Sequence, residues 1–174
     1  MKKIFVKMFF VCILSVAGTA VAETSDLVIL GWVEKVYLVD PGIEIEAKLD
    51  TGAETSSLDA RVIKKFRKGG KRWVRFAVTD RDSGEEFILV RKRIRTIGVI
   101  QHDGSTQTRP VVLLEVCIGG ELLKTEVSLI GRTEFDYPLL LGRSALALFA
   151  LVDPGSDFLS EPGCGSQDQG KPGL

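Results

Sequence analysis

The sequence predicts a mostly β, single-domain protein, a small closed barrel or sandwich with one or two short helices. Three observations support this prediction. Apolar and polar residues alternate in short runs, glycine-rich turns separate these runs, and the 174-residue chain is long enough for one core only. Short strands divided by regular turn signals are typical of all-β barrels and sandwiches.

The clearest strand covers residues 43–50, where apolar and polar side chains alternate strictly. Residues 27–39 predict one or two strands before it, with a turn at residues 40–42. After it, residues 56–59 predict either an extended segment or the start of a short helix that continues over residues 61–66.

Two hairpins are predicted further along the chain. The first joins residues 73–78 to residues 85–94 through an Asp-Ser-Gly turn, and the second joins residues 111–118 to residues 122–130 through Gly119-Gly120. The last elements that the sequence predicts are a short core strand at residues 139–141 and a helix-like stretch at residues 142–149.

The first 22 residues have the features of a secretory signal. A basic start is followed by an apolar run at residues 8–17 and by the small-x-small site Ala20-Val21-Ala22. The apolar run is short for a membrane span, so we expect a cleaved signal peptide at residues 1–22, a secreted or periplasmic protein and no stable membrane insertion. An uncleaved N-terminal anchor is the alternative. Cleavage removes three lysines and no acid, and the mildly negative mature charge gives no reason to expect nucleic acid as a partner.

The domain is expected to cover residues 23–153. From residue 154 to residue 174 the chain is rich in Gly, Pro, Ser, Asp and Gln, which predicts a disordered tail. Two cysteines remain after signal cleavage. An oxidising compartment permits a disulfide between them, but we expect a buried Cys117 and a free Cys164, because a flexible tail does not place its sulfur reliably.

Asp50, Thr51 and Gly52 follow directly on the clearest strand. Gly52 allows backbone segments to approach closely, Thr51 offers a hydroxyl, and Asp50 ends a buried strand. Such a carboxylate can activate a water for attack on a carbonyl, provided that a second carboxylate lies beside it. The alternative is an ordinary turn aspartate that bonds its own backbone.

This segment carries a family resemblance. Asp50-Thr51-Gly52-Ala53 resembles the active-site signature of aspartic peptidases, and residues 138–146 are similar to the apolar-apolar-Gly-Arg segment of retropepsins. Residues 30–154 resemble a bacterial retropepsin-like aspartic peptidase family whose members are often labelled "ATP-dependent zinc protease". The resemblance implies a closed retropepsin-like barrel. Asp82 also precedes Ser-Gly, but charged residues surround it, so we expect an exposed turn there. With one catalytic aspartate per chain, the chemistry requires a homodimer.

The resemblance also implies roles for other residues. Ala53, Glu54, Gly142 and Arg143 would brace the site, with an ion pair between Glu54 and Arg143. The alternative is two ordinary surface charges. His102, Asp103 and Gly104 would form the tip of a flap over the substrate, which is compatible with a plain exposed turn. The terminal segments, residues 27–30 and 150–152, are expected at the dimer interface.

The words "zinc" and "ATP" find no support in the sequence. His102 is the single histidine, the cysteines lack zinc spacing, and no phosphate-binding glycine loop occurs, so no metal or cofactor is expected. Two basic runs, at residues 64–72 and 91–95, predict solvated faces or a surface that steers acidic peptides.

The expected function is therefore an aspartic endopeptidase that acts through paired Asp50 carboxylates on a peptide or protein substrate, with acidic substrates suggested by glutamate-adding ligases associated with some relatives. A non-catalytic peptide-binding module of the same fold is the alternative. A metallopeptidase is a third possibility, against which the absence of ligand motifs argues.

Overall fold

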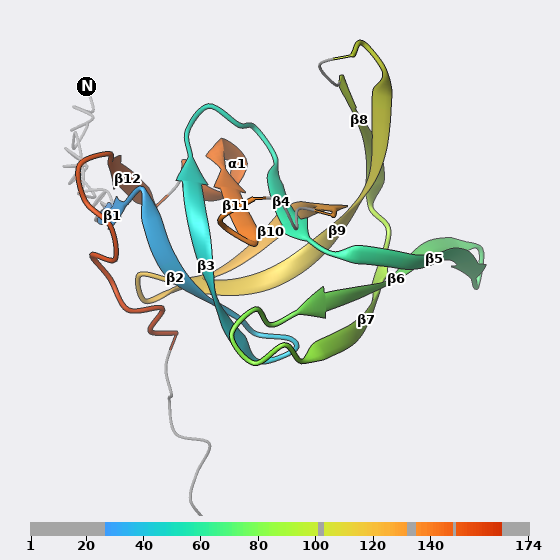
Figure 1. The fold of residues 1–174 in the computed structure, drawn as a ribbon, viewed down its shortest axis with the longest axis horizontal. Helices are drawn as coiled ribbons and strands as arrows, with labels where there is room; N and C mark the ends of the chain where they lie inside the picture. The colour runs from blue at the N-terminus through green and yellow to red at the C-terminus, as the bar shows by residue number, and fades with distance from the viewer. Residues whose placement is uncertain (1–26, 101–102, 132–134, 148, 165–174) are drawn as a thin grey trace, which may run out of the picture.

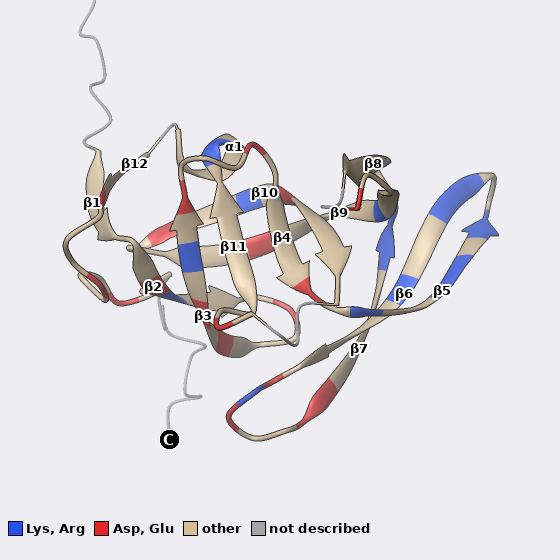
Figure 2. Ribbon diagram, turned by 45° about the horizontal axis from the view of Figure 1, so that its top comes forward, with Lys and Arg blue, Asp and Glu red and all other residues tan. Residues whose placement is uncertain are grey.

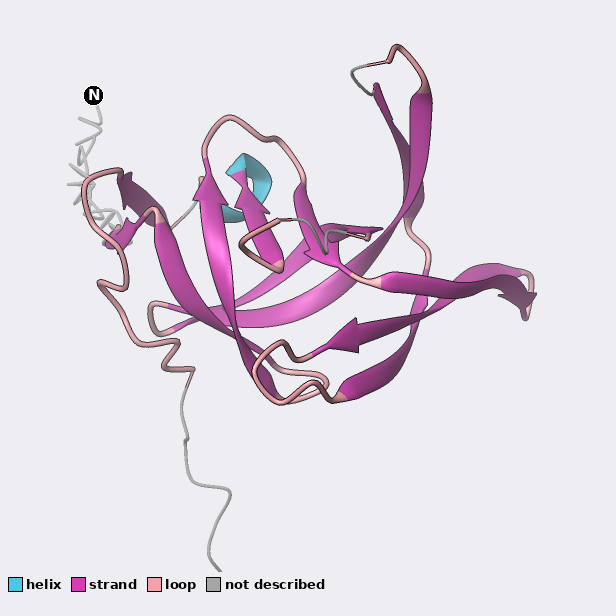
Figure 3. Ribbon diagram, in the orientation of Figure 1, coloured by secondary structure: helices cyan, strands magenta, loops and turns pink. Residues whose placement is uncertain are grey.

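The computed structural model describes residues 27–100, 103–131, 135–147 and 149–164, and over these residues the protein is almost entirely β-structure (Figures 1 and 3). This confirms the predicted mostly β class. The one helix in the described part is α1 (Arg143–Leu146), which is shorter than the predicted helical stretch. No helix among the described residues is long and apolar enough to span a membrane. The predicted signal peptide lies outside them.

One large sheet closes on itself to form a barrel. Its strand order is β10-β4-β11-β3-β2-β9-β8, and an additional pairing of β9 with β10 closes the ring. The strands are β2 (Val33–Leu38), β3 (Ile43–Asp50), β4 (Ser56–Asp59), β8 (Arg95–Ile100), β9 (Thr106–Ile118), β10 (Glu121–Ile130) and β11 (Leu139–Gly142). The closed barrel is thereby confirmed, and β8 extends the sheet beyond its rim as a hairpin with β9 (Figure 1).

The alternating side chains of these strands fill the barrel. In β3, every apolar residue from Ile43 to Leu49 is buried and every intervening charged residue is exposed. Burial of such alternate side chains supplies the main favourable term in folding. Strand β3 therefore carries its last residue, Asp50, out of the core at one end of the barrel.

A second sheet of three antiparallel strands lies beside the barrel. It consists of β5 (Arg61–Lys68), β6 (Lys71–Thr79) and β7 (Glu86–Lys92) in that order. Of the two alternatives for residues 61–66, the helix is wrong, because this segment pairs with β6 along its length. Val74, Phe76 and Leu89 are buried and join the sheet to the barrel core.

The terminal segments lie together. Strand β1 (Val28–Gly31) pairs in parallel with β12 (Ala150–Asp153), so the two segments expected at the dimer interface form a small sheet within one chain. Beyond β12 the chain turns along the barrel edge, where the Trp32 amide donates to the Ser156 carbonyl at 2.9 Å.

The predicted disordered tail is wrong for residues 154–164, which are ordered against the barrel. The Phe158 amide donates to the Val33 carbonyl at 2.8 Å. Cys164 forms a disulfide with Cys117, with a Cα–Cα distance of 5.2 Å, so the expectation of a free Cys164 is also wrong. Composition alone suggested disorder because the partners of this segment are far away in sequence. Residues 165–174 lie outside the described residues.

A buried carboxylate anchors the same segment. Glu34 is fully buried in β2, and its Oε1 accepts hydrogen bonds from the amides of Gly31 and Leu159 at 2.6 and 3.0 Å. Its Oε2 accepts from the Ser160 amide and hydroxyl, both at 3.2 Å. Both oxygens are thus satisfied, as a buried carboxylate requires.

Candidate active site

Three strands meet at the end of the barrel where Asp50 lies. Strand β11 runs between β3 and β4, parallel to β3 and antiparallel to β4. In this register Gly142 is the partner of Asp50, so two motifs that are about ninety positions apart in sequence lie side by side. The predicted site residues of both motifs therefore meet at one end of the barrel.

Asp50 begins a tight turn and is partly exposed. Its Oδ1 accepts hydrogen bonds from the amides of Gly52 at 2.9 Å and Ala53 at 3.2 Å. A Cβ on residue 52 would lie 3.1 Å from Oδ1, which is why glycine suits this position. Oδ2 makes no hydrogen bond within the described residues. One oxygen thus orients the carboxylate, and the other is available for chemistry.

Gly142 and Arg143 hold this turn from the neighbouring strand. A Cβ on residue 142 would lie 2.8 Å from the Glu54 carbonyl oxygen, so only glycine permits the observed approach. The Arg143 amide donates to the Ala53 carbonyl at 2.8 Å. The Arg143 Nη1 donates to the carbonyls of Thr51 and Gly52, each at 2.9 Å. The guanidinium therefore braces the backbone of the turn.

The predicted ion pair between Glu54 and Arg143 does not occur within the described residues. Arg143 directs its guanidinium to the turn carbonyls instead, and the exposed Glu54 contributes its carbonyl, which accepts from the Ser144 amide at 3.1 Å. Sequence reasoning missed a further brace. Buried Ser56 accepts from the Gly142 amide at 3.1 Å through its hydroxyl oxygen. No local pattern singles out Ser56, because β4 reads Ser-Ser-Leu-Asp and its partner Gly142 is 86 positions away.

A cavity of about 340 Å³ opens beside Asp50. Its lining includes Trp32, Lys48, Phe135, Tyr137 and Leu140 together with the catalytic candidate. The rings of Trp32 and Tyr137 meet edge to face at 5.8 Å, an arrangement that aromatic pairs favour. Desolvation raises the pKa of the Tyr137 hydroxyl above its ordinary value. An apolar hollow with a few polar groups is typical of a substrate site.

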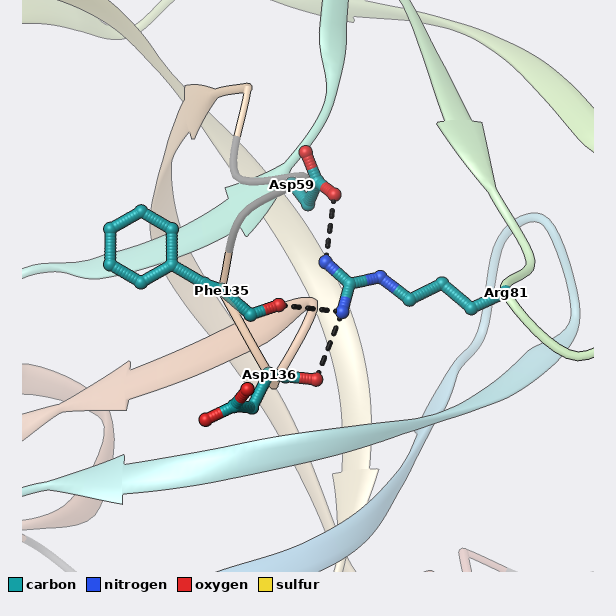
Figure 4. A network of polar contacts seen from close by, with 4 residues as sticks. All are labelled: Asp59, Arg81, Phe135 and Asp136. Carbon is teal, nitrogen blue, oxygen red and sulfur yellow. Dashed lines mark hydrogen bonds and ion pairs between the residues drawn. The ribbon is translucent and has the colours of Figure 1, made fainter.

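An arginine from outside the barrel fixes one wall of this cavity (Figure 4). Arg81 follows β6, and its Nη1 donates to the carbonyls of Phe135 and Asp136 at 2.8 and 2.9 Å. Its Nη2 pairs with the Asp59 carboxylate at 3.0 Å. Asp82, the next residue, lies in an exposed turn, as expected.

The β8–β9 hairpin carries the predicted flap tip. Figure 1 shows it rising on the same side of the barrel as the loop between β3 and β4. Asp103 Oδ1 accepts from the Ser105 amide at 2.9 Å, and Gly104 has a φ of 79°, as a tight turn requires. At the hairpin base, Arg95 Nη2 donates to the Thr55 hydroxyl at 3.3 Å, which links the hairpin to the loop that follows the Asp50 turn. His102 lies outside the described residues.

The described residues contain no group of three His, Cys, Asp or Glu side chains placed to hold a metal ion. The groups that converge at the site are instead a carboxylate, backbone carbonyls and amides, one guanidinium and aromatic rings. This set can orient a water and a peptide bond through hydrogen bonds.

Barrel topology and the braced Asp-Thr-Gly turn together define a retropepsin-like protein. A family model described as "Retropepsin-like aspartic endopeptidase RimB" matches residues 29–162. The chain belongs to this RimB-like family.

Relatives and a solved structure extend the comparison. A probable alpha-L-glutamate ligase of Shewanella pealeana is 33% identical over 122 residues, which are 68% of this chain and 27% of the ligase. Its counterpart in Parasynechococcus marenigrum is 35% identical over 120 residues, or 67% of this chain and 26% of the ligase. The chain thus spans about a quarter of these relatives. A Legionella pneumophila protein of unknown function (DUF785) is 35% identical in sequence, has a TM-score of 0.66, and covers 76% of this chain with 98% of its own.

Proposed function

We propose that this protein is an aspartic endopeptidase. The observation that carries the proposal is the half-bonded carboxylate of Asp50, whose Oδ1 is fixed by two amides while Oδ2 has no partner in the described part of the chain. The adjoining apolar cavity and the RimB-like family membership support it. The names of the relatives describe ligases, so the proposal rests on the site rather than on those names.

The reaction requires two Asp50 carboxylates, one from each protomer of a homodimer. Two carboxylates at contact distance share one proton, because both cannot ionise together. The ionised carboxylate takes a proton from a bound water as its oxygen attacks the peptide carbon. The protonated carboxyl gives its proton to the carbonyl oxygen. The tetrahedral intermediate then breaks its C–N bond as the leaving nitrogen is protonated.

The small terminal sheet supports the homodimer proposal. Leu27, Ile29 and Leu151 lie on β1 and β12 or next to them and are 47%, 61% and 54% exposed. Large apolar side chains gathered at one exposed edge are typical of a protein interface. Pairing of this sheet with its copy would cover them and would complete an active site that one chain leaves incomplete.

Acidic peptides are the substrates that we propose. The matching relatives are named as glutamate ligases, and the segment similar to this chain makes up about a quarter of each. A segment similar to this chain that is joined to a glutamate ligase has glutamate-containing peptides within reach. In this chain Lys48 lines the cavity beside Asp50 and offers a positive charge there, next to the side chain of Asp136 in the same lining. We propose that the predicted signal peptide at residues 1–22 directs this activity outside the cytoplasm.

The test compares the wild type with Asp50→Asn on a mixed peptide library, with and without chelator, between about pH 4 and pH 7. Loss of the ionisable group should lower the cleavage rate by about a hundredfold to ten-thousandfold, with a wild-type rate highest at acidic pH. Asp82→Asn is the matched control, because it makes the same change in an Asp-Ser-Gly sequence of an exposed turn. Equal activity of both variants would refute the proposal.

A peptide-binding module is the second candidate, since one chain holds only half of a catalytic pair. It is favoured if library peptides bind to folded protein and no Asp50-dependent cleavage occurs. Cleavage that chelator abolishes and Asp50→Asn preserves would instead indicate a metallopeptidase.

A further inference from the structure

The three-stranded sheet β5–β7 concentrates the positive charge of the molecule. Its strands carry ten lysine and arginine residues and one acidic residue, Glu86, whereas the whole chain has 23 basic and 23 acidic residues. Figure 2 shows the basic residues along β5 and β6, to one side of the barrel. The charge is therefore segregated onto one structural unit.

The strand register places like charges directly opposite each other. The pairs are Arg67 with Arg72, Lys68 with Lys71, and Lys64 with Arg75. Each such cross-strand pair destabilises a sheet. Of the ten basic residues, Arg61 and Arg91 alone have an acidic partner within the described residues. The other eight would gain from an anionic ligand that relieves their repulsion.

Two hollows adjoin these cations. A cavity of about 680 Å³ between the sheet and the barrel is lined by four cations, Arg61, Lys65, Arg81 and Arg109, and by two acids, Asp59 and Glu86. The acids pair with Arg81 and Arg61, whereas Lys65 and Arg109 have no acidic partner within the described residues. A hollow of about 380 Å³ is lined by Lys65, Phe66, Arg67, Arg72, Trp73 and Arg93. Lys65 lines both, so the two hollows adjoin each other along β5, and we call them together the basic track.

Arg109 adds a partly buried cation to the lining of the larger cavity. It lies on β9 and is partly buried, and its Nε donates to the Gln107 side chain at 2.8 Å. No carboxylate pairs with it within the described residues. Burial lowers the pKa of Arg109, since the charged guanidinium has lost part of its hydration. A carboxylate ligand would replace that hydration with a charge-assisted hydrogen bond.

We propose that sheet β5–β7 and the two hollows joined at Lys65 form a second binding site, outside the catalytic cavity, for an acidic segment of a polypeptide. Spaced cations beside the rings of Phe66 and Trp73 suit side chains that have a methylene stem and a carboxylate end. Arg81 lines the larger cavity and also holds the cleft wall, so the two sites adjoin. The assignment of the segment to a substrate rests on the proposed function, whereas its binding does not.

The two tryptophans of the chain provide separate reporters. Trp73 lines the basic track, and Trp32 lines the cavity beside Asp50. In an Asp50→Asn protein that also carries Trp32→Phe, fluorescence comes from Trp73 alone. Titration with a decaglutamate peptide should change this fluorescence in a saturable way, and added salt should weaken the binding.

Charge-matched variants locate the binding. In the same background, Lys65→Gln with Arg72→Gln should weaken decaglutamate binding by about tenfold, as expected for two lost ion pairs. The control, Lys35→Gln with Lys124→Gln, removes equal charge from the barrel, where both lysines already have acidic partners. It should change the affinity by less than about twofold.

Three results would overturn the site. These are an unchanged Trp73 signal, an equal loss of affinity in both double variants, and tighter binding of a single-stranded oligonucleotide than of decaglutamate at equal charge. The last result would assign the track to nucleic acid. The Asp50→Asn background keeps cleavage out of the binding assay. Decaglutamate binding at Trp73, together with a folded wild type that cleaves no library peptide, would refute the proposed function alone.

Discussion

Two irregular segments of this molecule are each held by a carboxylate that accepts hydrogen bonds from backbone amides. The two carboxylates differ in whether one oxygen atom remains without a hydrogen bond. Asp50 uses Oδ1 for the amides of Gly52 and Ala53 in its own turn. Glu34 uses both oxygens, and its partners Leu159 and Ser160 lie 125 and 126 positions away. A carboxylate with every oxygen bonded holds structure, whereas a half-bonded one can also react.

Burial separates the two groups as clearly as hydrogen bonding does. Glu34 is fully buried, and four donors surround its oxygens. No cation pairs with it in the described part of the chain, so these donors offset its desolvation. Asp50 is partly exposed and adjoins a cavity. The comparison predicts that the Asp50→Asn change proposed above removes activity, while changes around Glu34 remove stability.

The largest stability effect is expected from the disulfide that fixes the segment bound by Glu34. Cys164→Ser opens a covalent loop with a sequence separation of 47, which should lower the free energy of unfolding by about 3–4 kcal/mol. Urea denaturation with a constant slope measures this loss. Reduced wild type is the control and should match the variant. If the oxidised wild type and Cys164→Ser unfold at the same urea concentration, the bond does not stabilise the segment.

Glu34→Gln tests the carboxylate itself. The amide group would direct N–H donors at amides that are already donors, so at least one buried group loses its partner. We expect a loss of about 2–3 kcal/mol in the free energy of unfolding. Glu44→Gln is the matched control on β3, because Glu44 forms an exposed ion pair with Lys35 and should cost less than about 1 kcal/mol. Equal losses in the two variants would remove the distinction drawn here.

Local patterns explain what the sequence could predict. The alternation in β3 reaches Asp50 with the bounds that the structure shows, because side chains of a strand that covers a core must alternate. The Gly119-Gly120 hairpin between β9 and β10 follows from turn chemistry that acts within a few residues. The turn at residues 50–53 is equally local.

Long-range partners explain what the sequence did not reveal. The ordered segment 154–164 depends on Glu34 and Cys117, which its composition does not disclose. The cavity wall combines Trp32 with Tyr137, more than a hundred positions away. Arg143 has a motif that singles it out, but its choice of backbone carbonyls over Glu54 depends on three-dimensional geometry.

The smallest effect is expected at a third carboxylate, Asp153, at the start of the same terminal segment. It accepts from the Gly155 amide and the Ser156 hydroxyl, both at 2.9 Å, and these bonds lower its pKa below the ordinary value of 3.8. The ionised form is therefore favoured in the folded protein. Its stabilising contribution is present above the unfolded-state pKa and is lost as the pH falls through the lower folded-state pKa.

Asp153→Asn should therefore unfold at lower urea concentration than the wild type above about pH 5, and the two midpoints should converge below about pH 3. Asp157→Asn is the control, since Asp157 is exposed and its side chain makes no hydrogen bond within the described residues. A difference from wild type that stays constant across this pH range would mean that Asp153 acts by shape rather than charge. Asp153 would then differ from both Glu34 and Asp50, because these two carboxylates accept charge-assisted hydrogen bonds from backbone amides.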